Sequence, residues 1–84
     1  MYIVYAIKSQ KRNYIYVGMT SQLEERIKRH NKGYEKTTRP YRPFDLIYTE
    51  ECESRVIARR REKYFKSGIG KEFLKNIKQK LPGW

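Results

Sequence analysis

Hydrophobic residues occur in short runs at the start of the chain and at helical spacing further on. Tyr2 to Ile7 and Tyr14 to Met19 are rich in β-branched and aromatic residues, and the polar residues 8–13 separate them. Two such runs joined by a polar turn predict an antiparallel β-hairpin. Both runs are apolar on both of their alternating faces, which predicts a sheet covered on both sides.

Helical spacing begins after the hairpin. Residues 21–31 predict a first helix, because Ser21 and Glu24 fit a capping box and Gly33 supplies a stop signal. The rest of the chain predicts a loop, a third strand and two helices, over residues 32–43, 44–49, 54–67 and 70–80 in that order, with Gly68 ending the second helix. The element order ββαβαα predicts one α+β domain over residues 1–84, with a three-stranded antiparallel sheet flanked by helices.

The charge of the chain points to a polyanionic partner. Twenty Lys and Arg residues stand against nine Asp and Glu, which gives a formal net charge of +11. Such a field attracts nucleic acid or an anionic membrane surface. The charges are interleaved with eight tyrosines along the whole chain, whereas a membrane-surface helix separates its basic and apolar faces. Nucleic acid is therefore favoured, although charge alone does not separate an enzyme from a binding module.

Cysteine usage indicates a reducing compartment. Cys52 is the one cysteine, so it has no internal disulfide partner, and the sequence offers no Cys/His cluster for zinc. The apolar start of the chain is far shorter than the roughly 20 residues that cross a bilayer. We expect a cytoplasmic protein without a membrane segment.

Two tyrosines in the predicted hairpin are candidate functional residues. With the strands paired in register, Tyr5 and Tyr16 lie on the same face of the sheet. Gly18 lies on the same side of its strand as Tyr16 and leaves space beside the phenols. The structural alternative is cross-strand aromatic packing with each hydroxyl hydrogen-bonded.

Arg26 and His30 are one turn apart on the first predicted helix. Leu23 and Ile27 would anchor this helix to the sheet, so the two flanking polar residues can point along the sheet edge. In isolation each has an ordinary explanation: a solvated arginine, and a histidine favoured by the dipole at the helix end.

Glu62 is the candidate metal ligand. It shares a helical stripe with Ala58 and Phe65, the side that would pack on the sheet, and a carboxylate buried there needs a partner. Mg²⁺ is often held by one or two carboxylates with phosphate oxygens and water. The alternative is an ion pair with Lys66, four residues on.

Together these residues resemble the GIY-YIG endonuclease superfamily, in particular its small stand-alone members. Residues 16–18 read Tyr-Val-Gly, the second half of the family's name motif, and residues 3–5 take the place of the first half. The spacing continues to Arg26 and to His30-Asn31, and Glu62 stands in a segment similar to the family's glutamate-bearing helix. The resemblance spans nearly the whole chain. It departs from the pattern at Ile3, which replaces a glycine.

The resemblance implies a divalent-metal-dependent endonuclease that hydrolyses phosphodiester bonds. Glu62 would hold Mg²⁺ or Mn²⁺, and Arg26 would contact the scissile phosphate. Tyr5 would orient or deprotonate the attacking water, with His30 and Tyr16 positioning the phenols and the phosphate. Whether Tyr5 is a true general base stays open, because its pKa would have to fall from about 10 towards neutrality. The family often has an asparagine near its glutamate, and Asn76 is the candidate here.

DNA is the expected substrate, and RNA is an alternative. Six cations along the end of the first helix and the loop would capture it: Lys28, Arg29, Lys32, Lys36, Arg39 and Arg42. Their alternative role is a solvated surface. Larger family members gain sequence specificity from added segments, so we expect little sequence specificity, as in a structure-selective enzyme of DNA repair or recombination. The competing hypothesis is a non-catalytic basic DNA- or RNA-binding module on the same fold.

Overall fold

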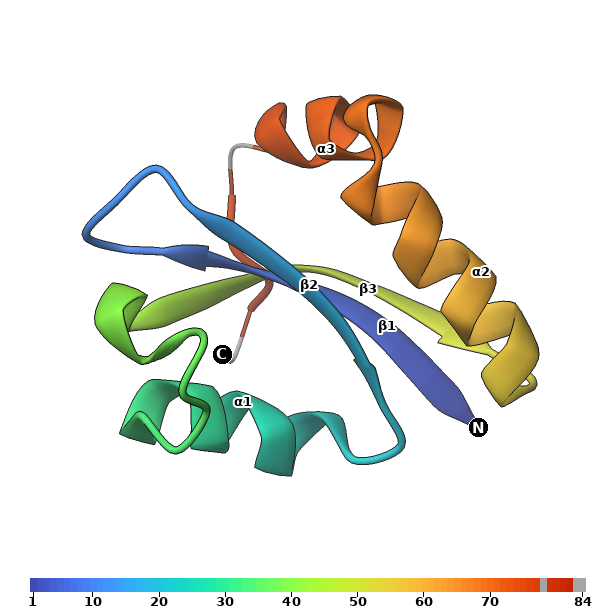
Figure 1. The fold of residues 1–84 in the computed structure, drawn as a ribbon, viewed down its shortest axis with the longest axis horizontal. Helices are drawn as coiled ribbons and strands as arrows, with labels where there is room; N and C mark the ends of the chain where they lie inside the picture. Colours follow the sequence, from blue (N-terminus) through green and yellow to red (C-terminus); the bar gives the residue numbers. More distant parts are fainter. Residues whose placement is uncertain (78, 83–84) are drawn as a thin grey trace.

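The computed structural model describes residues 1–77 and 79–82. Three antiparallel strands, β1 (Tyr2–Ser9), β2 (Ile15–Thr20) and β3 (Phe44–Cys52), form one sheet in the order β2-β1-β3. The helices are α1 (Leu23–Lys32), α2 (Arg55–Lys66) and α3 (Gly68–Lys75), with a short 3₁₀ helix η1 (Arg39–Tyr41) in the loop before β3. This order confirms the predicted ββαβαα α+β fold (Figure 1).

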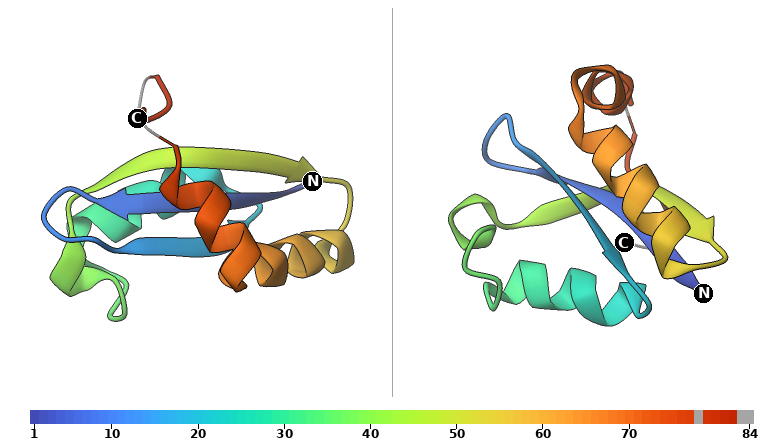
Figure 2. Two further views of the ribbon diagram at one scale, coloured as in Figure 1. Left: turned by 90° about the horizontal axis from the view of Figure 1, so that it is seen from above. Right: turned by 45° about the vertical axis from the view of Figure 1, so that its right-hand side comes forward.

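The sheet is covered on both faces, as the sequence predicts. Val4 and Ala6 of the central strand pack in one core with residues of α2 and α3. Tyr5 and Ile7 point the other way and pack in a second core with Ile27 of α1. In Figure 1 the sheet accordingly lies between α1 on one side and α2 with α3 on the other, and the right-hand view of Figure 2 shows the same layers. None of the helices in the described residues is long and apolar enough to cross a membrane.

The first helix begins later than predicted. Its N-cap is Gln22 and no side chain caps it, so the predicted capping box of Ser21 and Glu24 is wrong. Thr20 Oγ1 accepts a hydrogen bond from the Gln22 N–H at 3.0 Å, and this local turn occupies the position that the box would take. The predicted stop at Gly33 is confirmed: φ is +82°, a conformation that suits glycine, and its N–H bonds back to α1.

The boundary between the last two helices lies at Ser67, and the prediction that Gly68 ends α2 is wrong. Ser67 ends α2 and also caps α3, since its side chain accepts from the Gly70 N–H at 3.5 Å. A Cβ added at Gly70 would clash with the Tyr64 carbonyl oxygen, so glycine allows α3 to lie close against α2. The described part of α3 ends at Lys75 rather than Lys80, and the predicted range crosses Lys78, which lies outside the described residues.

The third strand is longer than predicted. It continues from Thr49 to Cys52, because Glu50 and Glu51 still pair with the central strand opposite Val4 and Ile3. Acidic residues are uncommon in strands, so the composition of residues 50–52 does not indicate that the strand continues. The edge of β3 that does not pair with β1 is partly covered, since the Leu81 N–H donates to the Leu46 carbonyl at 2.8 Å.

A charged cluster joins the end of β3 to α2. Arg61 donates two hydrogen bonds to the Glu50 carboxylate, one of them at 3.0 Å, and Tyr48 Oη donates a third at 2.7 Å. The hydrogen bond from Arg61 is the main reason that the pKa of Glu50 lies below its ordinary value. The Arg61 guanidinium also lies 5.0 Å from the ring centroids of Tyr64 and Phe65, which fixes it against the helix.

We predict that Glu50→Gln lowers the free energy of unfolding by about 1 kcal/mol at pH 7. A hydrogen bond to a charged group can be worth more, but Arg61 is partly exposed, and solvent screening reduces the value. The pKa of Glu50 is lower in the folded protein than in the unfolded one, so its carboxylate stabilises the fold at pH values above the unfolded pKa. This stability is lost as the pH falls below about 5. Urea unfolding of both proteins from pH 7 to pH 3 should therefore show the difference shrinking with acid. A difference that stays constant would contradict the role of the carboxylate charge.

Candidate active site

Tyr5 and Tyr16 lie on the same face of the hairpin. The strands pair Tyr5 with Gly18, and the two tyrosine rings are 6.3 Å apart between centroids. A Cβ added at Gly18 would lie 2.6 Å from Tyr5 Oη and 3.0 Å from Tyr16 Cε2. Glycine is thus needed beside the phenols as predicted, but the Tyr5 hydroxyl itself fills the space.

A buried chain of hydrogen bonds runs from Tyr5 into the loop after α1. Tyr5 Oη lies 2.8 Å from His30 Nε2, and His30 Nδ1 lies 2.8 Å from Thr38 Oγ1. The Thr38 hydroxyl in turn donates to the Glu35 carbonyl at 3.4 Å. All three side chains are closed to solvent, with Tyr5 and Thr38 0% and His30 1% exposed. The structure brings Tyr5 and His30 together, and Thr38 joins them.

The hydrogen bond from Thr38 to Glu35 favours one arrangement of the protons along these side chains. A hydroxyl has one proton, so donation to Glu35 leaves the Thr38 oxygen to accept from His30 Nδ1–H. Nε2 is then the acceptor, and Tyr5 donates to it. Burial lowers the pKa of His30 to about 4, so the imidazole is neutral at pH 7. Burial likewise raises the pKa of Tyr5 above its ordinary value, although nearby Arg26 opposes part of the rise. The free protein therefore holds Tyr5 as a neutral phenol.

Arg26 and Glu62 line one cleft of about 350 Å³ at the β2 edge of the sheet. Their helices cover opposite faces of the sheet, yet both side chains reach this edge, where β2 ends at Thr20. The effect of Arg26 on the pKa of Tyr5 places its guanidinium near the buried phenol as well. Arg26 thus adjoins both the open cleft and the Tyr5–His30 pair. Tyr16 is half-buried, with its ring centroid 5.1 Å from that of His30.

Glu62 is held between two cations. Its carboxylate lies 3.2 Å from Lys66 Nζ and 3.7 Å from Arg59 Nε, and its side chain is 14% exposed. The predicted alternative, an ion pair with Lys66, is therefore present in the structure. Ala58 and Phe65 are buried on the same stripe, as predicted. The carboxylate thus lies at the edge of this buried stripe and lines the cleft.

The cations predicted to capture substrate have different surroundings. Lys28 pairs with Glu24 at 3.4 Å, and Arg29 pairs with Glu35 at 3.0 Å. Arg39 donates to the Gly33 carbonyl at 2.8 Å, and Arg42 packs over the same glycine. Lys32 and Lys36 are exposed. The structure thus gives Arg29, Arg39 and Arg42 a part in holding the loop against α1.

Three residues around the site were not predicted from the sequence: Arg55, Arg59 and Thr38. Arg55, Arg59 and Lys66 line the cleft with Glu62, and their spacing along α2 is that of one helical stripe, a signal that was available. The sequence pattern does not indicate Thr38, because only the fold of an irregular loop brings this residue into contact with His30. Asn76 follows the last turn of α3 and is not among the residues lining the cleft.

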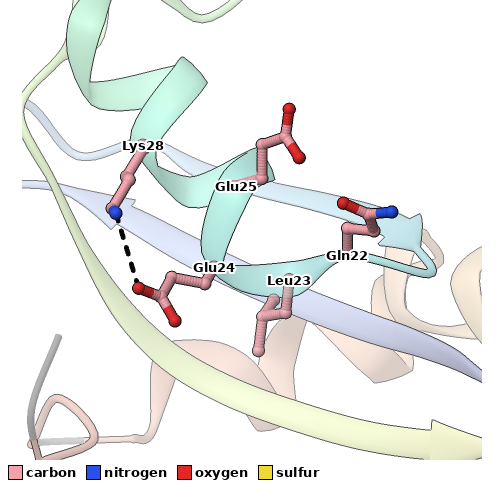
Figure 3. A pocket seen from close by; sticks show the side chains of 5 residues that line it. All are labelled: Gln22, Leu23, Glu24, Glu25 and Lys28. Atoms are coloured by element: carbon pink, nitrogen blue, oxygen red, sulfur yellow. Dashed lines mark ion pairs between the residues drawn. The ribbon is translucent and has the colours of Figure 1, made fainter.

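A wider hollow of about 550 Å³ lies on the outer side of α1 (Figure 3). It is lined by Gln22, Leu23, Glu24, Glu25 and Lys28, and in Figure 3 Glu24 pairs with Lys28 while Glu25 points elsewhere. Two carboxylates against one paired cation repel a phosphate, so this hollow is a poor site for a polyanion.

Several known proteins are similar to this chain in sequence or fold. The GIY-YIG catalytic domain matches residues 1–76. A UPF0213 protein of Clostridium perfringens is 38% identical over 81 residues, which cover 95% of this chain and 86% of the relative. A UPF0213 protein of Staphylococcus haemolyticus is 38% identical over 78 residues, 92% and 94% of the two chains. The solution NMR structure of a UPF0213 protein from Bacillus halodurans has 34% identity and a TM-score of 0.54, covering 93% of this chain and 86% of its own.

The chain belongs to the GIY-YIG family, a family of nucleases. It resembles small relatives of similar length, since the alignments cover most of each partner. The expected superfamily is thereby confirmed.

We predict that Thr38→Val changes the tautomer of His30. Valine keeps the size of the side chain but removes the oxygen that accepts from Nδ1–H, leaving a buried donor unpaired. The ¹⁵N shifts of the imidazole should indicate Nδ1–H in the wild type and a mixture or the other tautomer in the variant. Thr38→Ser, which keeps the hydroxyl, is the control and should retain the wild-type spectrum. Identical spectra for all three would show that Thr38 does not set the tautomer.

Proposed function

We propose that the protein is a divalent-metal-dependent endonuclease that hydrolyses phosphodiester bonds of DNA with little sequence specificity. The observation that carries this proposal is the meeting of Arg26 and Glu62, from helices on opposite faces of the sheet, in one cleft beside the Tyr5–His30 pair. The net charge of +11 favours a polyanionic substrate.

Arg26 binds the scissile phosphate in this proposal. Its planar guanidinium presents paired N–H donors that match phosphate oxygens, and its charge stabilises the extra negative charge of the transition state. Arg59 and Lys66 line the same cleft and add positive charge around that phosphate.

Glu62 would hold the metal. The described residues contain no group of three or more His, Cys, Asp or Glu side chains placed to bind an ion. A single carboxylate fits Mg²⁺ or Mn²⁺ in a mode where water and phosphate oxygens complete the coordination. Bound there, the ion supplies positive charge that polarises the phosphate and neutralises the leaving oxygen.

Tyr5 and His30 accept and relay the proton of the attacking water. As the water oxygen bonds to phosphorus, its proton passes to Tyr5 Oη while the phenol proton passes to His30 Nε2. The neutral imidazole can receive that proton at Nε2, and because burial lowers its pKa to about 4, the negative charge of the bound phosphate must stabilise the imidazolium that results. The phosphorus–oxygen bond to the leaving group breaks, and solvent protonates the leaving oxygen. Because Tyr5 is closed to solvent in the free protein, the side chains around its hydroxyl must move before water can reach it.

The competing function is a non-catalytic basic module that binds nucleic acid. Two observations favour it: Glu62 is already paired with Arg59 and Lys66, and the Tyr5 hydroxyl is buried. Binding to DNA or RNA without any divalent-dependent cleavage of either would establish this function instead.

We predict that Glu62→Gln abolishes Mg²⁺-dependent nicking of plasmid and branched DNA while DNA binding is retained or tightened. The amide is a poor metal ligand, and removing the carboxylate removes repulsion of the phosphate. Its surface pairs are worth at most about 1 kcal/mol, so the variant should stay folded by circular dichroism. Glu72→Gln on α3 makes the same charge change at an exposed position and should cut like the wild type. Equal cutting by Glu62→Gln would place the metal ligand elsewhere.

We also predict that Arg26→Lys slows cleavage by roughly 10²–10³-fold, the usual loss when one transition-state donor is removed. Lysine keeps the charge but lacks the paired donors, so binding in the presence of a chelator should change little. Arg12→Lys in the exposed hairpin turn is the matched control. Single-turnover rates at saturating protein separate the chemical step from binding. A rate within a factor of two of wild type would remove Arg26 from the chemistry.

A further inference from the structure

The cleft with Arg26 and Glu62 adjoins two shallow hollows, one on each side. It shares Arg26 with a neighbouring hollow of about 380 Å³ on the α1 side, which also includes Arg29. It shares Arg55 and Arg59 with another hollow of about 340 Å³ on the α2 side, which includes Arg60. We call these three adjoining hollows the edge groove: the cleft and the α1-side hollow lie where β2 ends, and the third lies along α2.

Positive charge in the edge groove is concentrated on α2. Arg55, Arg59 and Arg60 occupy its first two turns and line the groove. Arg55 and Arg60 have no ion pair within the part of the chain that the structure describes. On the α1 side, Glu25 lies in the same hollow and Arg29 is paired with Glu35. A polyanion thus meets more uncompensated charge on α2.

The groove is suited to the nucleic-acid backbone rather than to unpaired bases. Single-strand binding sites usually offer exposed aromatic rings for stacking. Among the residues that the structure describes (1–77 and 79–82), Tyr2 is the one aromatic side chain that lines these hollows, and it is only partly exposed. The exposed rings of Tyr34 and Tyr64 lie outside the groove, each beside an arginine. The groove therefore favours charge contacts with phosphates.

We propose that the first two turns of α2 form the principal DNA-binding surface, where Arg55, Arg59 and Arg60 hold the sugar-phosphate backbone of duplex DNA next to the scissile phosphate. This deepens the proposed function of the same cleft and rests on it. The sequence predicts DNA binding by the loop after α1. We assign this loop a secondary part in binding, because Arg29, Arg39 and Arg42 hold the loop against α1.

Two double variants with the same change of charge test the proposal. Arg55→Gln/Arg60→Gln alters the α2 surface, and Lys32→Gln/Lys36→Gln alters exposed cations of the α1 end and loop. Each double variant lowers the net charge by two. If DNA were attracted only by the overall field of the protein, both variants would therefore weaken binding equally. Affinity for a short duplex is measured in a chelator over a salt series, with folding checked by circular dichroism. The α2 variant should bind about tenfold or more weakly and lower the salt slope by about two. The loop variant should lose no more than about threefold, since screening limits distant charges.

Three results would overturn the proposal: equal losses in the two variants, a greater loss in the loop variant, or no binding of the duplex by the wild type. Tighter wild-type binding of a single strand than of a duplex of equal length would overturn the assignment of duplex DNA. Because the binding assay contains a chelator, it does not depend on cleavage. A wild type that binds through α2 but cuts no substrate with Mg²⁺ would leave this surface established while the proposed nuclease function fails.

Discussion

Burial of the central strand on both faces is the constraint on which the structure depends. Val4, Tyr5, Ala6 and Ile7 are consecutive in β1 and almost fully closed to solvent, so successive side chains serve two different cores. One core requires α2 and α3 and the other requires α1. A chain this short buries enough apolar surface only by using both faces of its sheet. The two helices that carry the candidate site must consequently lie on opposite sides.

That arrangement leaves few places where the two helices can contribute to one site. The sheet has three strands, and β2 is the edge strand beside β1. Side chains from α1 and α2 can meet by reaching around this edge, and Arg26 and Glu62 do so in the cleft where β2 ends. The buried Tyr5 and His30 lie behind Arg26, on the α1 face. The location of the site thus follows from the narrowness of the sheet.

The sequence predicts those features that depend on neighbours along the chain. Alternation in β1, the glycine stop at Gly33 and the helical spacing of Arg26 and His30 are local patterns, and the structure contains all of them. The extension of β3 through Glu50 escaped prediction because the central strand pairs with it and Arg61 neutralises it. Thr38 and the carbonyl that binds Arg39 belong to an irregular loop, where composition gives no period from which contacts can be inferred. For this reason the sequence did not show that Arg29, Arg39 and Arg42 hold the loop against α1.

The depth at which each half of the candidate site lies determines how it can change during evolution. Tyr5, His30 and Thr38 are surrounded by an aromatic core, so replacing any of them disturbs packing and leaves buried polar atoms unpaired. Glu62 and Arg26 stand at the rim, where replacement changes stability little. In the proposed nuclease, one change at the rim would abolish catalysis and leave a folded, basic protein. Among relatives, we expect the buried residues to be kept with the fold, and the rim residues to change wherever selection no longer acts on the proposed chemistry.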